Sequence, residues 1–154
     1  MTNTATTSIA LAPGEGTSYA AGPSAVTIKV GSEETAGALA ILEYTAAPGF
    51  PGPGLHVHPE FDESFYVLEG TGRFSLGEDT MDLSAGGFLF VPGDQPHTWA
   101  NPFDERLRML LVCRPGGFDR FVADVAAAVA DGRAADPAFM PGLWERYGMA
   151  AVDY

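Results

Sequence analysis

The chain has few basic side chains. Its 154 residues contain eight lysines and arginines, with Lys29 as the only lysine, against 20 aspartates and glutamates. The resulting net charge is −12. A surface this acidic repels phosphate backbones and anionic lipid headgroups, so we expect neither a nucleic-acid nor a membrane partner.

Cysteine and long apolar runs are also scarce. Cys113 is the only cysteine, so no intrachain disulfide can form, and a reducing compartment is compatible with the sequence. No apolar stretch approaches roughly 18 residues, and no basic residue precedes Lys29. We therefore expect no membrane span and no secretory signal, and we expect a cytoplasmic protein.

Histidine occurs only three times, and its placement is informative. His56 and His58 are two residues apart in GLHVHPEFDE, and His97 follows in VPGDQPHTWAN. Side chains two apart on a strand point to the same face, roughly 6.5–7 Å apart at the backbone. Two such imidazoles can converge on one metal ion, whose metal–nitrogen bonds are about 2.0–2.1 Å long. The histidines therefore predict a metal site.

Three carboxylates follow the first two histidines closely. They are Glu60, Asp62 and Glu63, and all of them come after Pro59. Strand alternation alone puts Glu60 and Asp62 on the face of the histidines. A turn at Pro59 can reset that alternation, because proline ends the strand. The spacing therefore leaves open which carboxylate joins the site.

The rest of the chain up to Cys113 is typical of an all-β protein. Short β-like runs are separated by Gly- and Pro-containing turns at intervals of roughly 8–12 residues. This spacing predicts an antiparallel sandwich or barrel. The runs are 25–30, 38–44, 56–58, 64–69, 72–76, 80–83, 88–91, 97–100 and 106–113.

The apolar spacing becomes helical after Pro115-Gly116-Gly117. The apolar residues at steps of three and four are Phe118, Phe121, Val122, Val125 and Val129. Gly132 is expected to end this helix. Asp136-Pro137 is expected to start a short last helix, which Pro141-Gly142 interrupts before residues 143–147.

These patterns predict three regions. Residues 1–24 form a flexible N-terminal segment, which we consider as a source of a strand that docks on a partner subunit. Residues 25–114 form the β-barrel, and residues 115–154 form a C-terminal helical extension. No internal repeat is present, so a chain of two barrels is excluded.

Two motifs in this sequence resemble those of the cupins. The first cupin motif reads G-x5-H-x-H-x3/4-E-x6-G, and its spacing is matched by His56, His58, Glu63 and Gly70, although Phe50 occupies the position of the leading glycine. The second reads G-x5-P-x-G-x2-H-x3-N. It is matched by Gly86, Pro92, His97 and Asn101, with Asp94 in place of the second glycine.

The resemblance implies a single cupin barrel, a double-stranded β-helix or jelly roll, with short C-terminal helices. It implies His56, His58, Glu63 and His97 as ligands of one divalent transition metal. Three imidazoles and one carboxylate suit Fe, Mn, Ni, Co, Cu or Zn, and the ligand types do not select among them. The Pro-Gly-Gly-Phe junction and the helices look like those of quercetin dioxygenase-like cupins. Cupins are commonly dimers, so we expect a homodimer.

A metal site with open coordination positions indicates catalysis. We expect a dioxygenase that acts on a small enolic or phenolic molecule and uses dioxygen. Glu63 would bind the metal and assist deprotonation, and Phe65, Trp99 and Met109 would line the substrate cavity. Two alternatives are open: a redox-neutral isomerase, cyclase or lyase that uses the metal as a Lewis acid, and a non-catalytic module that binds a small molecule.

Overall fold

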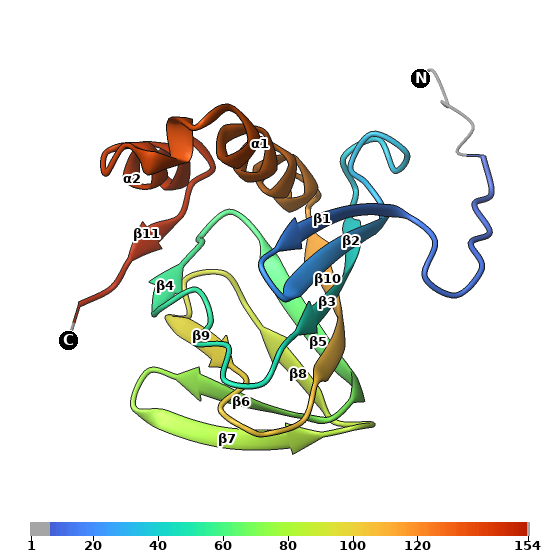
Figure 1. Ribbon diagram of the computed structural model, residues 1–154, viewed down its shortest axis with the longest axis vertical. Helices are drawn as coiled ribbons and strands as arrows, with labels where there is room; N and C mark the ends of the chain where they lie inside the picture. The colour runs from blue at the N-terminus through green and yellow to red at the C-terminus, as the bar shows by residue number, and fades with distance from the viewer. Residues whose placement is uncertain (1–6, 154) are drawn as a thin grey trace.

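Two antiparallel β-sheets face each other in the computed structural model, which describes residues 7–153 (Figure 1). The first sheet has the order β1 (Thr17–Ala21), β2 (Ser24–Val30), β3 (Ala40–Ala46), β10 (Leu107–Arg114), β5 (Asp62–Glu69), β8 (Phe88–Val91). The second has the order β11 (Ala150–Ala151), β4 (His56–Val57), β9 (His97–Ala100), β6 (Thr71–Leu76), β7 (Asp79–Ser84). This architecture confirms the predicted all-β barrel.

Each of the nine predicted β-runs forms a strand, with ends that differ by up to two residues. The two-residue differences are in β3, which begins at Ala40 rather than at residue 38 and ends at Ala46 rather than at 44, and in β5, which begins at Asp62 rather than at 64. The strand that carries the first histidines ends at Val57, so His58 lies just beyond it. Two further strands, β1 and β11, were not predicted.

Strand β1 corrects the expectation for the N-terminal segment. It pairs along its whole length with β2 of the same chain, from Thr17 opposite Ile28 to Ala21 opposite Ser24. Residues 17–21 are therefore part of the sheet and not of a flexible segment or a strand on a partner subunit. The first six residues of that predicted segment lie outside the described residues.

The core lies between the two sheets and follows from strand alternation. On β10, Leu107, Met109, Leu111 and Cys113 are buried, and the residues between them are half-buried. The inner face of β5 adds Phe65 and Val67, and the second sheet adds Phe74 and Trp99. These apolar side chains fill the barrel below the level of the histidines.

Two helices lie together at one end of the barrel (Figure 1). Helix α1 (Phe118–Asp131) ends at Gly132, which has a φ of 84°, as predicted. In its last turn Ala128 is buried and Val129 is exposed, so Val129 is not on the buried face that we predicted. No helix within residues 7–153 has both the length and the apolar character that a bilayer span requires.

The last helix differs from the prediction at its start. Helix α2 (Phe139–Arg146) follows a short 3-10 helix, η1 (Arg133–Ala135), and begins two residues after Pro137. Asp136 is not the N-cap of α2: that position is held by Ala138, which has no side-chain cap bond, and Asp136 Oδ1 instead accepts a hydrogen bond from the Ala138 amide at 2.9 Å in the turn before the helix. Pro141 lies in the first turn, where no intrahelical donor is lost, so it does not interrupt the helix.

Asn101 joins the two halves of the barrel. It is fully buried, and its Nδ2 lies 3.1, 3.0 and 2.8 Å from the backbone oxygens of Ala46, Ala47 and Glu105, to which it donates. Its own amide donates to the Phe50 oxygen at 2.9 Å. The side chain thus satisfies carbonyl groups at the end of β3 and in the loops that follow β3 and β9.

Replacing Asn101 by alanine is expected to lower the free energy of unfolding by about 3 kcal/mol. The substitution leaves buried carbonyls without donors, and each lost hydrogen bond costs about 1 kcal/mol or more. Urea titration of Asn101→Ala measures the effect. Thr80→Ala, at an exposed strand position, is the control and is expected to change the value by less than about 0.5 kcal/mol. Equal stability of the two variants would contradict the assigned role.

Candidate metal centre

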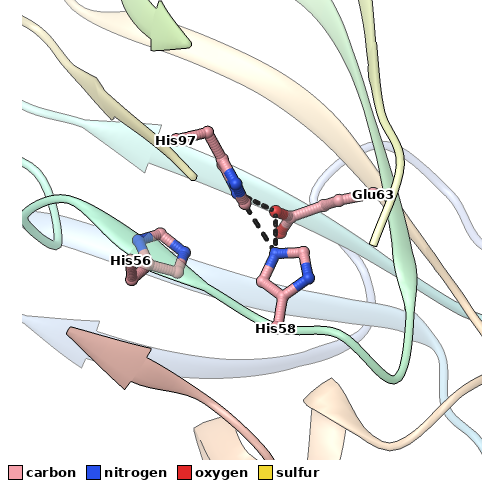
Figure 2. Close-up of side chains that lie close together, drawn as sticks. All are labelled: His56, His58, Glu63 and His97. Carbon is pink, nitrogen blue, oxygen red and sulfur yellow. Dashed lines mark hydrogen bonds and ion pairs between the residues drawn. The ribbon is translucent and has the colours of Figure 1, made fainter. Parts of the chain in front are cut away.

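Four buried side chains from both sheets meet inside the barrel (Figure 2). His56 on β4 lies directly opposite His97 on β9 in the second sheet. His58 follows two residues later, and Glu63 enters from β5 of the first sheet. One donor atom from each residue can be chosen so that all four lie within 4.8 Å of one another.

The turn after His58 decides which carboxylate joins the histidines. The Phe61 amide donates to the His58 oxygen at 3.3 Å, which closes a tight turn and shifts the strand alternation. As a result Glu63 points inward and is buried, whereas Glu60 is exposed. Asp62 accepts a hydrogen bond from the Gly93 amide at 2.9 Å. The geometry therefore selects Glu63, as the family resemblance implied.

The turn before His97 is held against the turn after His58. Asp94 has a φ of 68°, a left-handed conformation that aspartate tolerates better than most residues. A Cβ at Gly93 would lie 2.7 Å from the Pro59 oxygen, so only glycine allows this approach. The two turns that carry the ligands thus position each other.

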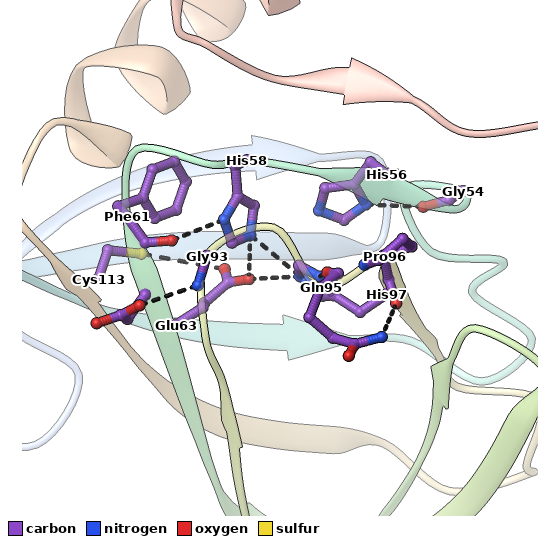
Figure 3. Close-up of polar contacts among 11 residues, drawn as sticks. Gly54, His56, His58, Phe61, Glu63, Gly93, Gln95, Pro96, His97 and Cys113 are labelled. Carbon is purple, nitrogen blue, oxygen red and sulfur yellow. Dashed lines mark hydrogen bonds and ion pairs between the residues drawn. The ribbon is translucent and has the colours of Figure 1, made fainter.

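Each histidine donates its Nδ1 proton to a backbone carbonyl (Figure 3). The acceptors are the oxygens of Gly54 for His56 at 2.9 Å, Phe61 for His58 at 3.0 Å and Gln95 for His97 at 2.9 Å. A carbonyl oxygen only accepts, so Nδ1 carries the proton in all three rings. In the neutral rings every Nε2 then carries a free lone pair, which is the arrangement that metal-binding histidines require.

The Nε2 atoms of His58 and His97 and the Glu63 carboxylate lie within hydrogen-bond distance of one another. His58 Nε2 lies 3.1 Å from His97 Nε2, and Glu63 Oε2 lies 2.9 and 2.8 Å from the two nitrogens. Two donors at right angles on an ion about 2.1 Å away would be about 3.0 Å apart. The residues therefore fit a divalent metal ion, and the cluster can hold one.

Burial acts to lower the pKa values of His56 and His58, whereas the negative charge of Glu63 acts to raise them. Burial lowers the pKa of His56 to about 4. Burial also disfavours a charge on His58, but its hydrogen bond to Glu63, the negative charge of Glu63 and its hydrogen bond to the Phe61 oxygen together outweigh this and raise the pKa. For Glu63, burial is outweighed by hydrogen bonds from His58 and His97, which lower the pKa to about 2. Glu63 therefore stays charged throughout the range in which imidazoles titrate.

Two aromatic rings cover the histidines, and the sequence analysis missed both roles. Phe61 stacks on His58 with ring centroids 3.9 Å apart, and Trp144 from α2 lies edge-on to His56 at 5.6 Å. Strand β11 follows α2 and pairs with β4, with Ala151 opposite His56. The position of Phe61 between His58 and Glu63 is a sequence signal for its role. Trp144 has no such signal, because it lies 88 residues after His56 (144 − 56).

The three residues expected to line a substrate cavity are all in the barrel interior. Phe65 lies 6.4 Å from His97 between ring centroids, Trp99 stacks on Phe50 at 5.3 Å, and Met109 is fully buried. A ligand could reach them only from inside the barrel. Tyr44 also faces inward, edge-on to Trp99 at 5.1 Å, and burial raises its pKa, so its hydroxyl keeps its proton.

The sequence matches a family model described as a cupin domain over residues 42–113. It is 37% identical over 60 residues to a protein named polyketide synthase CurC from Streptomyces cyaneus. That match covers 39% of this chain and 39% of the relative, so the chain spans well under half of the relative's length.

Solved structures agree with the fold. The polyketide cyclase RemF from Streptomyces resistomycificus has a TM-score of 0.53 and 22% identity, over 59% of this chain and 64% of its own. A structure from Thermotoga maritima, described as a predicted oxalate decarboxylase, has a TM-score of 0.56 and 22% identity, over 60% and 80%. Together with the family model, these likenesses support the cupin superfamily.

Metal content is expected to fall as the pH is lowered through about 6, because only neutral imidazoles bind metal. The raised pKa of His58 favours its protonation as the pH falls, while Glu63 remains charged down to about pH 2. Elemental analysis after equilibration at each pH measures the loss, and circular dichroism confirms that the chain stays folded. Unchanged metal content between pH 7 and pH 4.5 would contradict the three-histidine site.

Replacing His97 by alanine is expected to remove bound metal while the barrel stays folded, because the core below the site is apolar. Metal-to-protein ratio and thermal unfolding are the two measurements. Glu60→Gln is the matched control, since Glu60 is an exposed carboxylate three residues from Glu63, and it should keep its metal. A His97→Ala variant that retains the wild-type ratio would argue against the ligand set.

Proposed function

On the premise that residues 42–113 carry a cupin domain, we propose that this protein is a metal-dependent enzyme acting on a small enolic or phenolic molecule. The buried cluster of His56, His58, Glu63 and His97 carries the proposal. Four protein donors leave two positions free on a six-coordinate ion, and free positions distinguish catalytic from structural sites.

The surroundings of the cluster favour an apolar, ring-containing substrate. A groove of about 660 Å³ is lined by Trp144, whose ring lies edge-on to His56, although none of the four cluster residues lines it; its volume is within the usual range for small-molecule sites. Its walls are mainly apolar and include Val57, Met140 and Met149. The named polyketide synthase among the relatives points to the same class, since polyketides are rich in enolisable carbonyls.

The reaction we favour is a redox-neutral ring closure. A divalent ion in the cluster supplies a Lewis acid that makes an enol or phenol proton easier to remove. Glu63 is charged and adjacent, so it accepts that proton once the substrate's acidity has been raised. The resulting enolate or phenolate attacks a second carbonyl of the same molecule through carbon, and the alkoxide formed takes the proton back from Glu63. The new hydroxyl then leaves as water together with a hydrogen of the neighbouring carbon. Phe61 and Trp144 keep bulk water from the histidines.

Dioxygen-dependent cleavage is the second candidate. The same ligand set suits iron, manganese, nickel or copper, and the resemblance of the C-terminal helices to quercetin dioxygenase-like cupins points in this direction. The aromatic rings of Phe61 and Trp144 would serve both reactions, because they keep water from competing with the substrate or with dioxygen. Metal preference and oxygen use separate the two candidates.

The test is turnover of enolisable polyketones and polyphenols by protein loaded with zinc or with iron, with and without oxygen. Ring closure predicts products lighter by one water, formed with zinc under anaerobic conditions. Glu63→Gln is expected to lower the rate by roughly 100-fold or more. The control Glu60→Gln should match the wild type.

Oxygen uptake that requires a redox-active metal would favour the dioxygenase instead. Tight binding of these molecules without any conversion would favour a non-catalytic binding role. Each of these outcomes contradicts ring closure.

A further inference from the structure

One polar side chain faces the interior of the barrel and has no part in the metal centre. Tyr44 on β3 alternates with the outward-facing residues of that strand, as do Leu42 and Ala46, which are both fully buried. Its ring lies edge-on to Trp99, with centroids 5.1 Å apart, and Trp99 stacks on Phe50 at 5.3 Å. Tyr44 therefore brings a hydroxyl group into a space whose walls are aromatic and aliphatic.

The Tyr44 hydroxyl is left available for a ligand. No hydrogen bond joins it to another group within residues 7–153, whereas the hydroxyl of Tyr147 donates to Asp124 Oδ2 at 2.6 Å. In the same range, Thr98 Oγ1 is the one side-chain polar atom that is sealed from solvent and has no partner. The Tyr44 oxygen therefore keeps surface that a small molecule can contact, which agrees with the half-buried state of the residue.

The cross-strand register gives the position of Tyr44 relative to the metal centre. Cys113 on β10 lies opposite Glu63, and Met109, four residues earlier on the same strand, lies opposite Tyr44. Four residues span roughly 13 Å along a strand at the backbone. Burial raises the pKa of Tyr44, and the charge of Glu63 adds to this, so the hydroxyl lies within electrostatic range of the carboxylate. A molecule bound at the metal centre can therefore extend along the barrel to Tyr44.

A neutral hydroxyl in this position suits a carbonyl oxygen. Because its pKa is raised, the Tyr44 hydroxyl keeps its proton at neutral pH and can donate, and a carbonyl oxygen can only accept. Apolar surroundings strengthen such a hydrogen bond relative to one in water. When a carbonyl carbon is attacked, its oxygen gains negative charge, and a donor that is already in place stabilises this charge without reorganisation.

We infer that the Tyr44 hydroxyl holds a carbonyl oxygen of the substrate by a hydrogen bond, and that this oxygen becomes the alkoxide during ring closure. As the new carbon–carbon bond forms, the electron pair of the carbonyl double bond moves to this oxygen. Tyr44 keeps its own proton throughout, and the alkoxide takes the proton that Glu63 has accepted. The inference rests on the proposed function for the reaction, but the hydrogen bond itself can be measured without turnover.

Calorimetric titration of zinc-loaded protein with two ligands measures the hydrogen bond. One ligand is a linear triketone, which can bind zinc through two oxygens and present the third, and the other is the diketone of the same length, which lacks that oxygen. Tyr44→Phe is expected to weaken triketone binding by roughly 5- to 10-fold, the effect of one neutral hydrogen bond, and to leave diketone binding unchanged. Tyr66→Phe is the matched control, because Tyr66 is 44% exposed on the outer face of β5, and it should bind both ligands as the wild type does.

Turnover gives the second measurement. Tyr44→Phe is expected to lower kcat by roughly 100-fold and to raise KM by no more than it raises Kd, because the hydrogen bond strengthens as charge develops on the oxygen. Metal content and thermal unfolding should match those of the wild type, since the hydroxyl has no partner within residues 7–153.

The outcomes separate this inference from the proposed function. A wild type that prefers the triketone through Tyr44 but closes no ring would support the hydrogen bond and contradict ring closure. A wild type without preference for the triketone would overturn the inference, whatever the reaction. So would a Tyr44→Phe variant that binds the triketone as tightly as the wild type, or one that loses affinity for both ligands equally.

Discussion

The hydrogen bond from each histidine Nδ1 to a backbone carbonyl is the constraint on which the candidate centre depends. Gly54, Phe61 and Gln95 provide the three acceptors, and each belongs to the turn that holds its histidine. With the proton held at Nδ1, the three Nε2 lone pairs converge beside Glu63, where only a cation or added protons can satisfy them. The chemistry proposed for the protein follows from this one choice of tautomer.

The barrel makes this arrangement possible because its two sheets hold the ligands and two short turns, one after His58 and one before His97, orient them. His56 and His97 are cross-strand neighbours in one sheet, and Glu63 comes from the other, so the ligands span the space between the sheets. The contact of Gly93 with Pro59 holds the two turns together. Asn101, which follows β9, is hydrogen-bonded to the end of β3 in the other sheet. The site is therefore preorganised by elements that lie far apart in the chain.

Much of this could be predicted from the sequence, for identifiable reasons. Strand alternation located β10 and its buried residues, and Gly132 marked the end of α1. The alternation failed near Glu63, because a turn at Pro59 changes which residues point inward, and only the motif spacing selected the right carboxylate. It also did not reveal β1, whose sequence is rich in small residues.

By itself, the sequence determined the β-rich class, the positions along the chain of nine strands and the small number of histidines, which drew attention to three positions. These properties depend on local periodicity and composition, which are visible in any linear chain. Only the tertiary structure decided that Trp144 covers His56, that Ala151 pairs opposite it, and that the apolar residues of β5 and β8 share one exposed face. Those contacts join segments distant in the chain, and their formation depends on how the whole barrel closes.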